Sequence, residues 1–106
     1  MITEERVKMV QNLSEKHGFG PVELVEGELV IVQWGTSIVY QEDAVERKTL
    51  VDIITTPGYA VYETVGFEMD ADVSEIGAYP NFLNAVHAMF SRIYEMKIWQ
   101  ELMEMP

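Results

Sequence analysis

Residues 22–40, VELVEGELVIVQWGTSIVY, decide the fold class of this chain. Short runs rich in Val, Leu and Ile are separated by glycine-containing turn signals at residues 26–28 and 35–37, which is the pattern of a β-hairpin followed by a third strand. Residues 29–32 are apolar without alternation, a pattern typical of a strand covered on both faces. We therefore expect a sheet whose second face is covered by a helix of this chain or by another subunit.

Helical patterns lie on both sides of this β-rich segment. A first helix is predicted over residues 3–17, with Thr3 as N-cap and Gly18 at its C-terminal end. A second is predicted from Pro80, at the first helical position, to about Glu104. One face of that second helix carries an apolar stripe, formed by Phe82, Val86, Met89, Ile93, Met96 and Met103.

The segment between the third strand and the second helix is harder to interpret. Residues 41–56 are compatible with a helix or a strand, and their many β-branched side chains favour a charged turn at 45–48 followed by a strand. Another strand is predicted over residues 59–69, and a loop over 70–79. The expected fold is a single α+β domain over residues 1–106, with an N-terminal helix, an antiparallel meander of four to five strands, and a long C-terminal helix packed on the sheet.

Composition excludes several classes of protein. The chain has 106 residues, no cysteine, 7 Lys and Arg against 18 Asp and Glu, and a net charge of −11. Disulfide scaffolds and thiolate metal sites need cysteine, and direct nucleic-acid binding needs clustered Lys and Arg. No apolar run is long enough to span a membrane, and the first residues lack the pattern of a secretory signal, so we expect a cytoplasmic protein.

Motifs for catalysis, metals and cofactors are weak. The pair Gly18 and Gly20 lacks the third glycine of a dinucleotide-binding loop. A calcium loop over residues 70–81 needs glycine at its sixth position and glutamate at its twelfth, where this chain has Glu75 and Asn81. The two histidines, His17 and His87, have no metal-ligand spacing. The sequence therefore predicts no catalytic residue, no metal site and no cofactor.

Glu63 carries an alternative hypothesis. Strand alternation places it on the same face as Val61, toward the core, where a buried carboxylate could act as an acid or base or bind a ligand amine. A twist at Gly66 would instead turn it into solvent. On the first interpretation, a small ligand would bind between the sheet and the long helix, in a pocket lined by Trp34, Tyr40, Tyr59 and Glu63.

The methionines of the long helix allow two interpretations. Met89, Met96 and Met103 are seven residues apart, which suits a helix-pairing seam in a homodimer or a contact in a larger assembly. The same spacing suits a helix face packed on the sheet of its own chain.

Charge distribution is the strongest functional signal. No basic residue lies between Lys16 and Arg47, or between Lys48 and Arg92, although both segments are rich in acids. Such a surface suits a basic protein partner, because opposite charge speeds and orients association. The predicted partner-binding residues are Glu68, Asp70, Asp72 and Glu75, then Glu42, Asp43 and Glu46, with Tyr62 as aromatic anchor.

The leading hypothesis is a non-enzymatic acidic interaction protein. Its acids would imitate the phosphates of a nucleic acid, so that it acts as an inhibitor or decoy in the nucleic-acid-binding groove of a basic protein. In size and charge only, the chain resembles toxin-immunity proteins and phage inhibitors of host defence, which are often short, acidic and free of cysteine.

Overall fold

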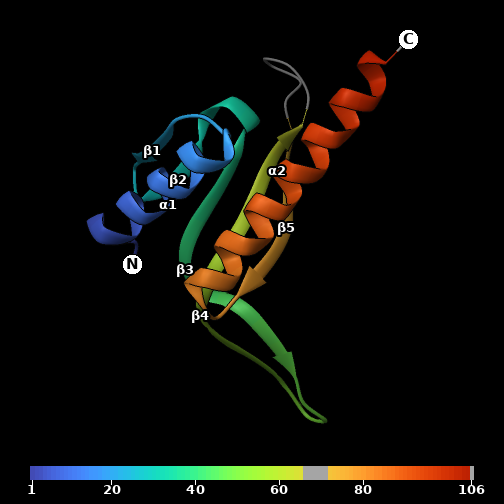
Figure 1. Cartoon of the computed structure of the whole chain (residues 1–106). Helices are drawn as coiled ribbons and strands as arrows, with labels where there is room; N and C mark the ends of the chain where they lie inside the picture. The colour runs from blue at the N-terminus through green and yellow to red at the C-terminus, as the bar shows by residue number, and fades with distance from the viewer. Residues whose placement is uncertain (66–71, 106) are drawn as a thin grey trace.

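Two helices cover one face of an antiparallel sheet in the computed structural model, which describes residues 1–65 and 72–105 (Figure 1). The α+β fold class, with an N-terminal helix and a long C-terminal helix on the sheet, is confirmed. The elements follow one another as α1 (Glu4–His17), β1 (Val22–Val25), β2 (Glu28–Ile31), a short 3-10 helix η1 (Val32–Trp34), β3 (Thr36–Lys48), β4 (Ile53–Val65), β5 (Asp72–Tyr79) and α2 (Phe82–Glu104).

The sheet is a simple meander. Its strands lie in the order β1-β2-β3-β4-β5, and each is antiparallel to its neighbours. Ile38 of β3 lies opposite Leu29 of β2 on one side and Val61 of β4 on the other. Since directly opposed side chains share a face, these three residues form an apolar row across the middle of the sheet.

The core lies between this row and the two helices. Leu29, Ile38 and Val61 are fully buried, as are Met89 and Ile93 of α2. Val7 and Val10 of α1 and Phe82 and Val86 of α2 belong to the same cluster. Both helices therefore pack on the same face of the sheet.

Both helices begin at a side-chain cap. The Thr3 hydroxyl accepts a hydrogen bond from the N–H of Arg6, and the Asn81 side chain accepts one from the N–H of Leu83. Helix α1 ends at Gly18, whose φ of 70° is the left-handed conformation that glycine adopts without strain. Pro80 precedes the cap of α2, so its predicted place at the first helical position is wrong by two residues.

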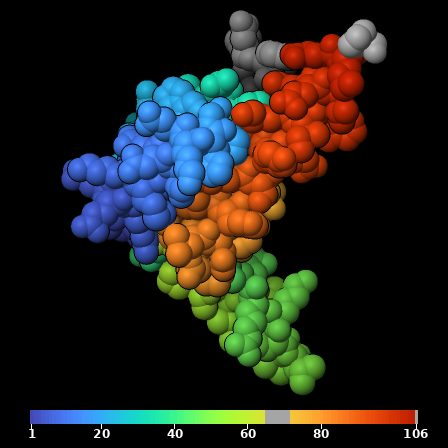
Figure 2. Space-filling view, viewed as in Figure 1, coloured from blue at the N-terminus to red at the C-terminus, as the bar shows by residue number. Residues whose placement is uncertain are grey.

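A two-stranded arm extends from the sheet. β2 pairs with β3 only as far as Ile38, and β5 pairs with β4 only from Tyr59 onward. The remaining residues 42–57, called the hairpin arm below, project beyond the body of the molecule (Figures 1 and 2). At its base, a Cβ on Gly58 would lie 2.6 Å from the Tyr79 carbonyl oxygen, so the close approach of these strands requires glycine.

The arm corrects the interpretation of residues 41–56. These residues contain no helix, and the predicted turn at 45–48 is part of β3, since Val45 pairs with Thr56 and Lys48 with Ile53. The turn lies at residues 49–52, where the N–H of Thr49 donates to the carbonyl oxygen of Asp52 over 2.8 Å.

Two other predicted segments differ from the structure. The loop expected over residues 70–79 is the strand β5 from Asp72 onward, because its backbone pairs with β4. Residues 32–34 form η1 and not the end of a strand. In β2, Leu29 and Ile31 are buried under the helices, whereas Val30 is partly exposed on the opposite face, so this strand is not covered on both faces by the described residues.

No helix within the described residues is long and apolar enough to cross a membrane.

The burial of the methionine stripe predicts unequal effects of truncation. Met89→Ala removes a fully buried side chain, so we expect the free energy of unfolding to fall by about 2–5 kcal/mol. Met103 is 83% exposed, and Met103→Ala should change stability by less than about 0.5 kcal/mol. Urea denaturation measures both; equal effects would mean that the stripe is not divided between core and surface.

Candidate functional site

The face of the sheet opposite the helices is uncovered by any described element, and is called the open face below. Strand pairing defines its residues, because Ser37 lies opposite both Val30 and Tyr62, and Tyr62 lies opposite Glu75. Val39 lies on the same face two residues farther along β3, opposite the fully buried Ala60. Apolar and polar side chains therefore alternate across a surface that a partner can reach.

A shallow groove of about 430 Å³ runs along this face. It is lined by Glu28, Val30, Gly35, Ser37, Val39, Gln41, Tyr62, Thr64 and Val73. The Gln41 amide donates a hydrogen bond to the Tyr62 hydroxyl over 3.2 Å, which orients the aromatic ring across the groove. An oriented, partly exposed tyrosine is the type of side chain that anchors many protein interfaces.

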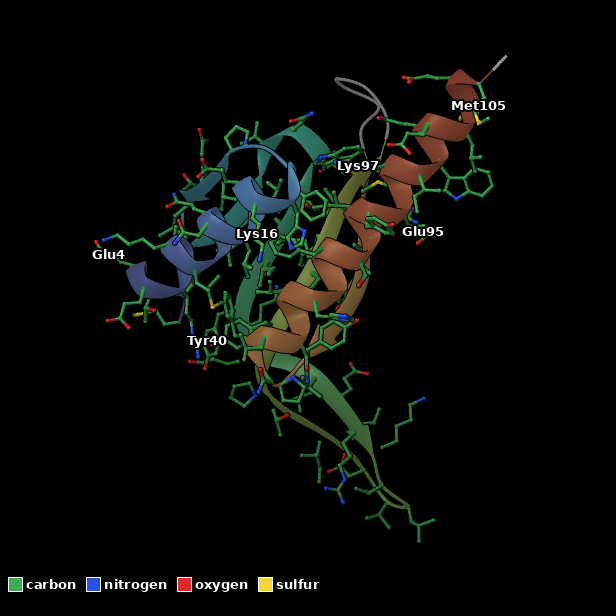
Figure 3. All side chains as sticks on the ribbon, viewed as in Figure 1. Glu4, Lys16, Tyr40, Glu95, Lys97 and Met105 are labelled. Carbon is green, nitrogen blue, oxygen red and sulfur yellow. The ribbon has the colours of Figure 1, made fainter. Side chains whose placement is uncertain are left out.

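Carboxylates surround this apolar floor. By pairing, Glu23 and Glu28 lie on the open face near its β1–β2 edge, and Glu75 lies on β5 at the other edge. All seven basic residues lie elsewhere: Arg6, Lys8 and Lys16 on α1, Arg92 and Lys97 on α2, and Arg47 and Lys48 on the hairpin arm. Figure 3 shows Lys16 and Lys97 on the helices. The open face is therefore acidic around an apolar centre, which suits a cationic and partly apolar ligand.

The structure brings together part of the predicted partner-binding set. Glu68 and Asp70 lie outside the described residues. Asp72 and Glu75 are both exposed on β5, but their spacing of three places their side chains on opposite faces of the strand. Of this first group, Glu75 lies on the open face, directly opposite Tyr62.

The second predicted group lies apart from the groove. Glu42, Asp43 and Glu46 are exposed on the hairpin arm, and none of them lines the groove. Sequence reasoning missed Glu23, Glu28 and the apolar floor. A partial signal was present, since Glu23 alternates with the buried Val22 and Glu28 with the buried Leu29, but Val30 is apolar like its buried neighbours Leu29 and Ile31.

The residues of the predicted small-ligand pocket do not form one site. Tyr40 and Tyr59 pack together with ring centroids 5.4 Å apart, and Tyr59 meets the edge of Phe82 at 5.2 Å. The Arg6 guanidinium lies 4.8 Å from the centre of the Phe82 ring and hydrogen-bonds the Tyr59 hydroxyl. Glu63 lies four residues beyond Tyr59 along β4, which places it roughly 13 Å from Tyr59 at the usual rise of a strand.

Glu63 forms an ion pair that the sequence did not reveal. Its Oε2 accepts a hydrogen bond from Nε of Arg92 over 2.8 Å, and its Oε1 lies 3.3 Å from a second guanidinium nitrogen. The hydrogen bond to Glu63 raises the pKa of Arg92, and burial opposes this rise. The Glu63 side chain is 14% exposed, so alternation placed it on the correct face, but it is held by a partner from α2.

Trp34 and the methionines have other surroundings. Trp34 packs against the core from η1, and its buried Nε1 finds no hydrogen-bond partner among the described residues. Met89 is buried, Met96 packs against the core from its edge, and Met103 is exposed. The heptad-spaced residues therefore do not form one continuous exposed seam.

A second groove brings together the two histidines. His17 of α1 and His87 of α2 line a hollow of about 420 Å³ with Phe19, Phe90, Ser91 and Tyr94. The His17 ring stacks on Phe19 with centroids 5.7 Å apart. The described residues contain no cluster of three or more His, Cys, Asp or Glu placed to hold a metal ion.

No family model, curated protein or solved structure matches this chain.

The ion pair predicts a measurable coupling between β4 and α2. In a double-mutant cycle with Glu63→Gln and Arg92→Met, we expect the two residues to stabilise the fold together by about 1 kcal/mol, because Arg92 is one-third exposed and partly screened by solvent. Urea denaturation of the four proteins measures this coupling. Strictly additive effects would show that the contact contributes nothing to stability.

Proposed function

We propose that this chain is a non-enzymatic interaction protein that binds a basic segment of another protein on the open face of its sheet. The observation that carries this proposal is the separation of charge. Acids surround an apolar groove on the open face, whereas every basic residue lies on a helix or on the hairpin arm.

The chemistry of the groove favours a cationic partner with apolar side chains. Val30, Val39 and Tyr62 offer apolar contact area, and Glu23, Glu28 and Glu75 offer carboxylates at the edges. Charged pairs at the edge of an interface mainly speed association and select the partner, while central aromatic and aliphatic contacts supply most of the affinity. The open face offers both the carboxylates that speed association and the apolar side chains that supply affinity.

More specifically, we propose that the chain acts as an inhibitor or decoy of a protein that binds nucleic acid. A protein groove that binds nucleic acid presents Lys and Arg side chains to phosphates. A chain with net charge −11 and an acidic, uncovered sheet face has the charge needed to compete for such a groove. Occupation of that groove would block nucleic-acid binding without any catalytic residue in this chain.

Neutralisation of the open face tests the proposal. We expect Glu23→Gln/Glu28→Gln/Glu75→Gln to weaken binding of a twelve-residue peptide with alternating basic and apolar side chains by at least about tenfold, because three carboxylates at the edges are lost. NMR titration measures the affinity and maps the contact. Shifts should concentrate on Val30, Val39 and Tyr62.

A matched variant controls for net charge. Glu4→Gln/Glu5→Gln/Glu15→Gln removes three exposed carboxylates from α1 and should leave peptide binding within about twofold, since α1 lies on the opposite side of the sheet. Equal weakening by both triple variants, or shifts confined to the helices, would contradict an interface on the open face.

A further inference from the structure

The tip of the hairpin arm is apolar without a local structural reason. Leu50 and Val51 are the middle residues of the loop 49–52 between β3 and β4, flanked by Thr49 and Asp52, and both side chains are almost entirely exposed. Short hairpin loops usually carry Gly, Asn or Asp, because these residues suit the turn and favour water. Ile53 and Ile54 beside the loop are also exposed, at 56% and 47%.

Basic residues accompany these apolar side chains. Arg47 lies directly opposite Ile54, and Lys48 lies directly opposite Ile53. Opposed residues share a face and successive residues alternate, so each face of the arm presents one cation beside one isoleucine. The tip therefore combines apolar side chains with the two cations of the arm, which lie beside Glu46 and Asp52.

The last turns of α2 present the complementary combination. The buried residues of this helix end at Ile93, and Tyr94, Ile98 and Leu102 then follow at four-residue spacing along one exposed face. Trp99 beside them is 59% exposed. This surface, called the helix end below, has an apolar stripe longer than two turns.

Acids lie beside the stripe at an unfavourable position. Glu101 and Glu104 are in the last turn of α2, where the negative end of the helix dipole repels carboxylates, and this turn contains no basic residue. Their placement costs helix stability within a single chain. A basic partner surface would compensate for it.

The two surfaces do not meet within one molecule. Figures 1 and 2 show the arm (green) projecting from one end and the last turns of α2 (red) at the opposite end. The chain extends 55 Å along its longest axis. A two-fold axis between two antiparallel copies would place each arm on the other copy's helix end, so that both contacts form at once.

We propose that the chain forms a reciprocal dimer in which the hairpin arm of each copy packs against the helix end of the other. Leu50, Val51 and the isoleucine on one face of the arm cover the stripe of Tyr94, Ile98 and Leu102. The cation on that same face lies toward Glu101 and Glu104. The dimer also supports the arm, since an isolated two-stranded hairpin is at best marginally stable in water.

Charge exchange between the two surfaces tests this dimer by sedimentation velocity at low salt. The unmodified chain should sediment at twice the 12.1 kDa mass of one copy. Arg47→Glu/Lys48→Glu alone, and Glu101→Lys/Glu104→Lys alone, should each raise the dissociation constant roughly tenfold to a hundredfold, because attraction becomes repulsion at both symmetric contacts.

Mixing the two charge-exchanged proteins is the decisive step. In the mixed pair each reversed arm meets a reversed helix end, and each natural arm meets a natural helix end, so the dimer should return to within about threefold of the original affinity. A monomeric natural chain, a dimer insensitive to both variants, or failure of the mixture to recover would overturn the proposal.

Two controls separate this surface from general charge effects. Lys8→Glu/Lys16→Glu changes the net charge by the same amount as Arg47→Glu/Lys48→Glu, but on α1, and should leave the dimer intact. The open-face variant Glu23→Gln/Glu28→Gln/Glu75→Gln should also dimerise normally, so the dimer and the peptide-binding proposal fail independently. Circular dichroism checks folding, and the lysines at the end of α2 should strengthen that helix.

Discussion

Packing of both helices against the same face of the sheet is the constraint on which the rest of the structure depends. Leu29, Ile38 and Val61 are buried beneath Met89 and Ile93, and no described helix remains to cover the other side. A five-stranded antiparallel sheet tolerates this arrangement, because one of its faces can remain in contact with water. The one-sided cover also separates charge, since the basic residues outside the arm belong to the two helices. The carboxylates of the open face therefore have no basic side chain beside them on the body of the sheet.

The same constraint explains the two apolar ends. Helix α2 has 23 residues and is roughly 35 Å long at 1.5 Å per residue, but its buried residues end at Ile93 and its packing against the core ends at Met96. The strands β3 and β4 have 13 residues each and outrun their neighbours at the other end. The hairpin arm and the helix end both expose large apolar side chains that are not buried in the core. Burial in a contact with another molecule would remove this area from water, which is the general driving force for association.

Local signals predicted the elements that local interactions determine. Thr3 and Gly18 defined α1, and the alternation around Gly27 defined the first hairpin, because caps and turns are set by neighbouring residues. The arm and β5 were misread for the opposite reason. The turn at residues 49–52 contains no glycine to indicate it, and β5 is stabilised by its pairing with β4 and not by its own sequence pattern. Glu63 was placed on the correct face by alternation, but its partner Arg92 is 29 residues away on α2. The open face was not predicted from the sequence: the pattern of residues 29–32 indicated a strand covered on both faces, and only the pairing of strands showed that Tyr62 and Glu75 lie beside each other.

The two proposed surfaces do not compete for the same residues. The open-face groove is lined from β2, β3, β4 and β5 without any residue of the hairpin arm or of α2. A reciprocal dimer through the arm and the helix end would therefore keep both open faces available. Two linked sites can bind a partner that carries two basic segments with an avidity well above that of one site, provided that their spacing matches. Disruption of the dimer by Arg47→Glu/Lys48→Glu should then leave affinity for a single basic peptide unchanged and weaken binding only to a target with two such segments. This difference distinguishes an effect of valency from damage to the groove itself.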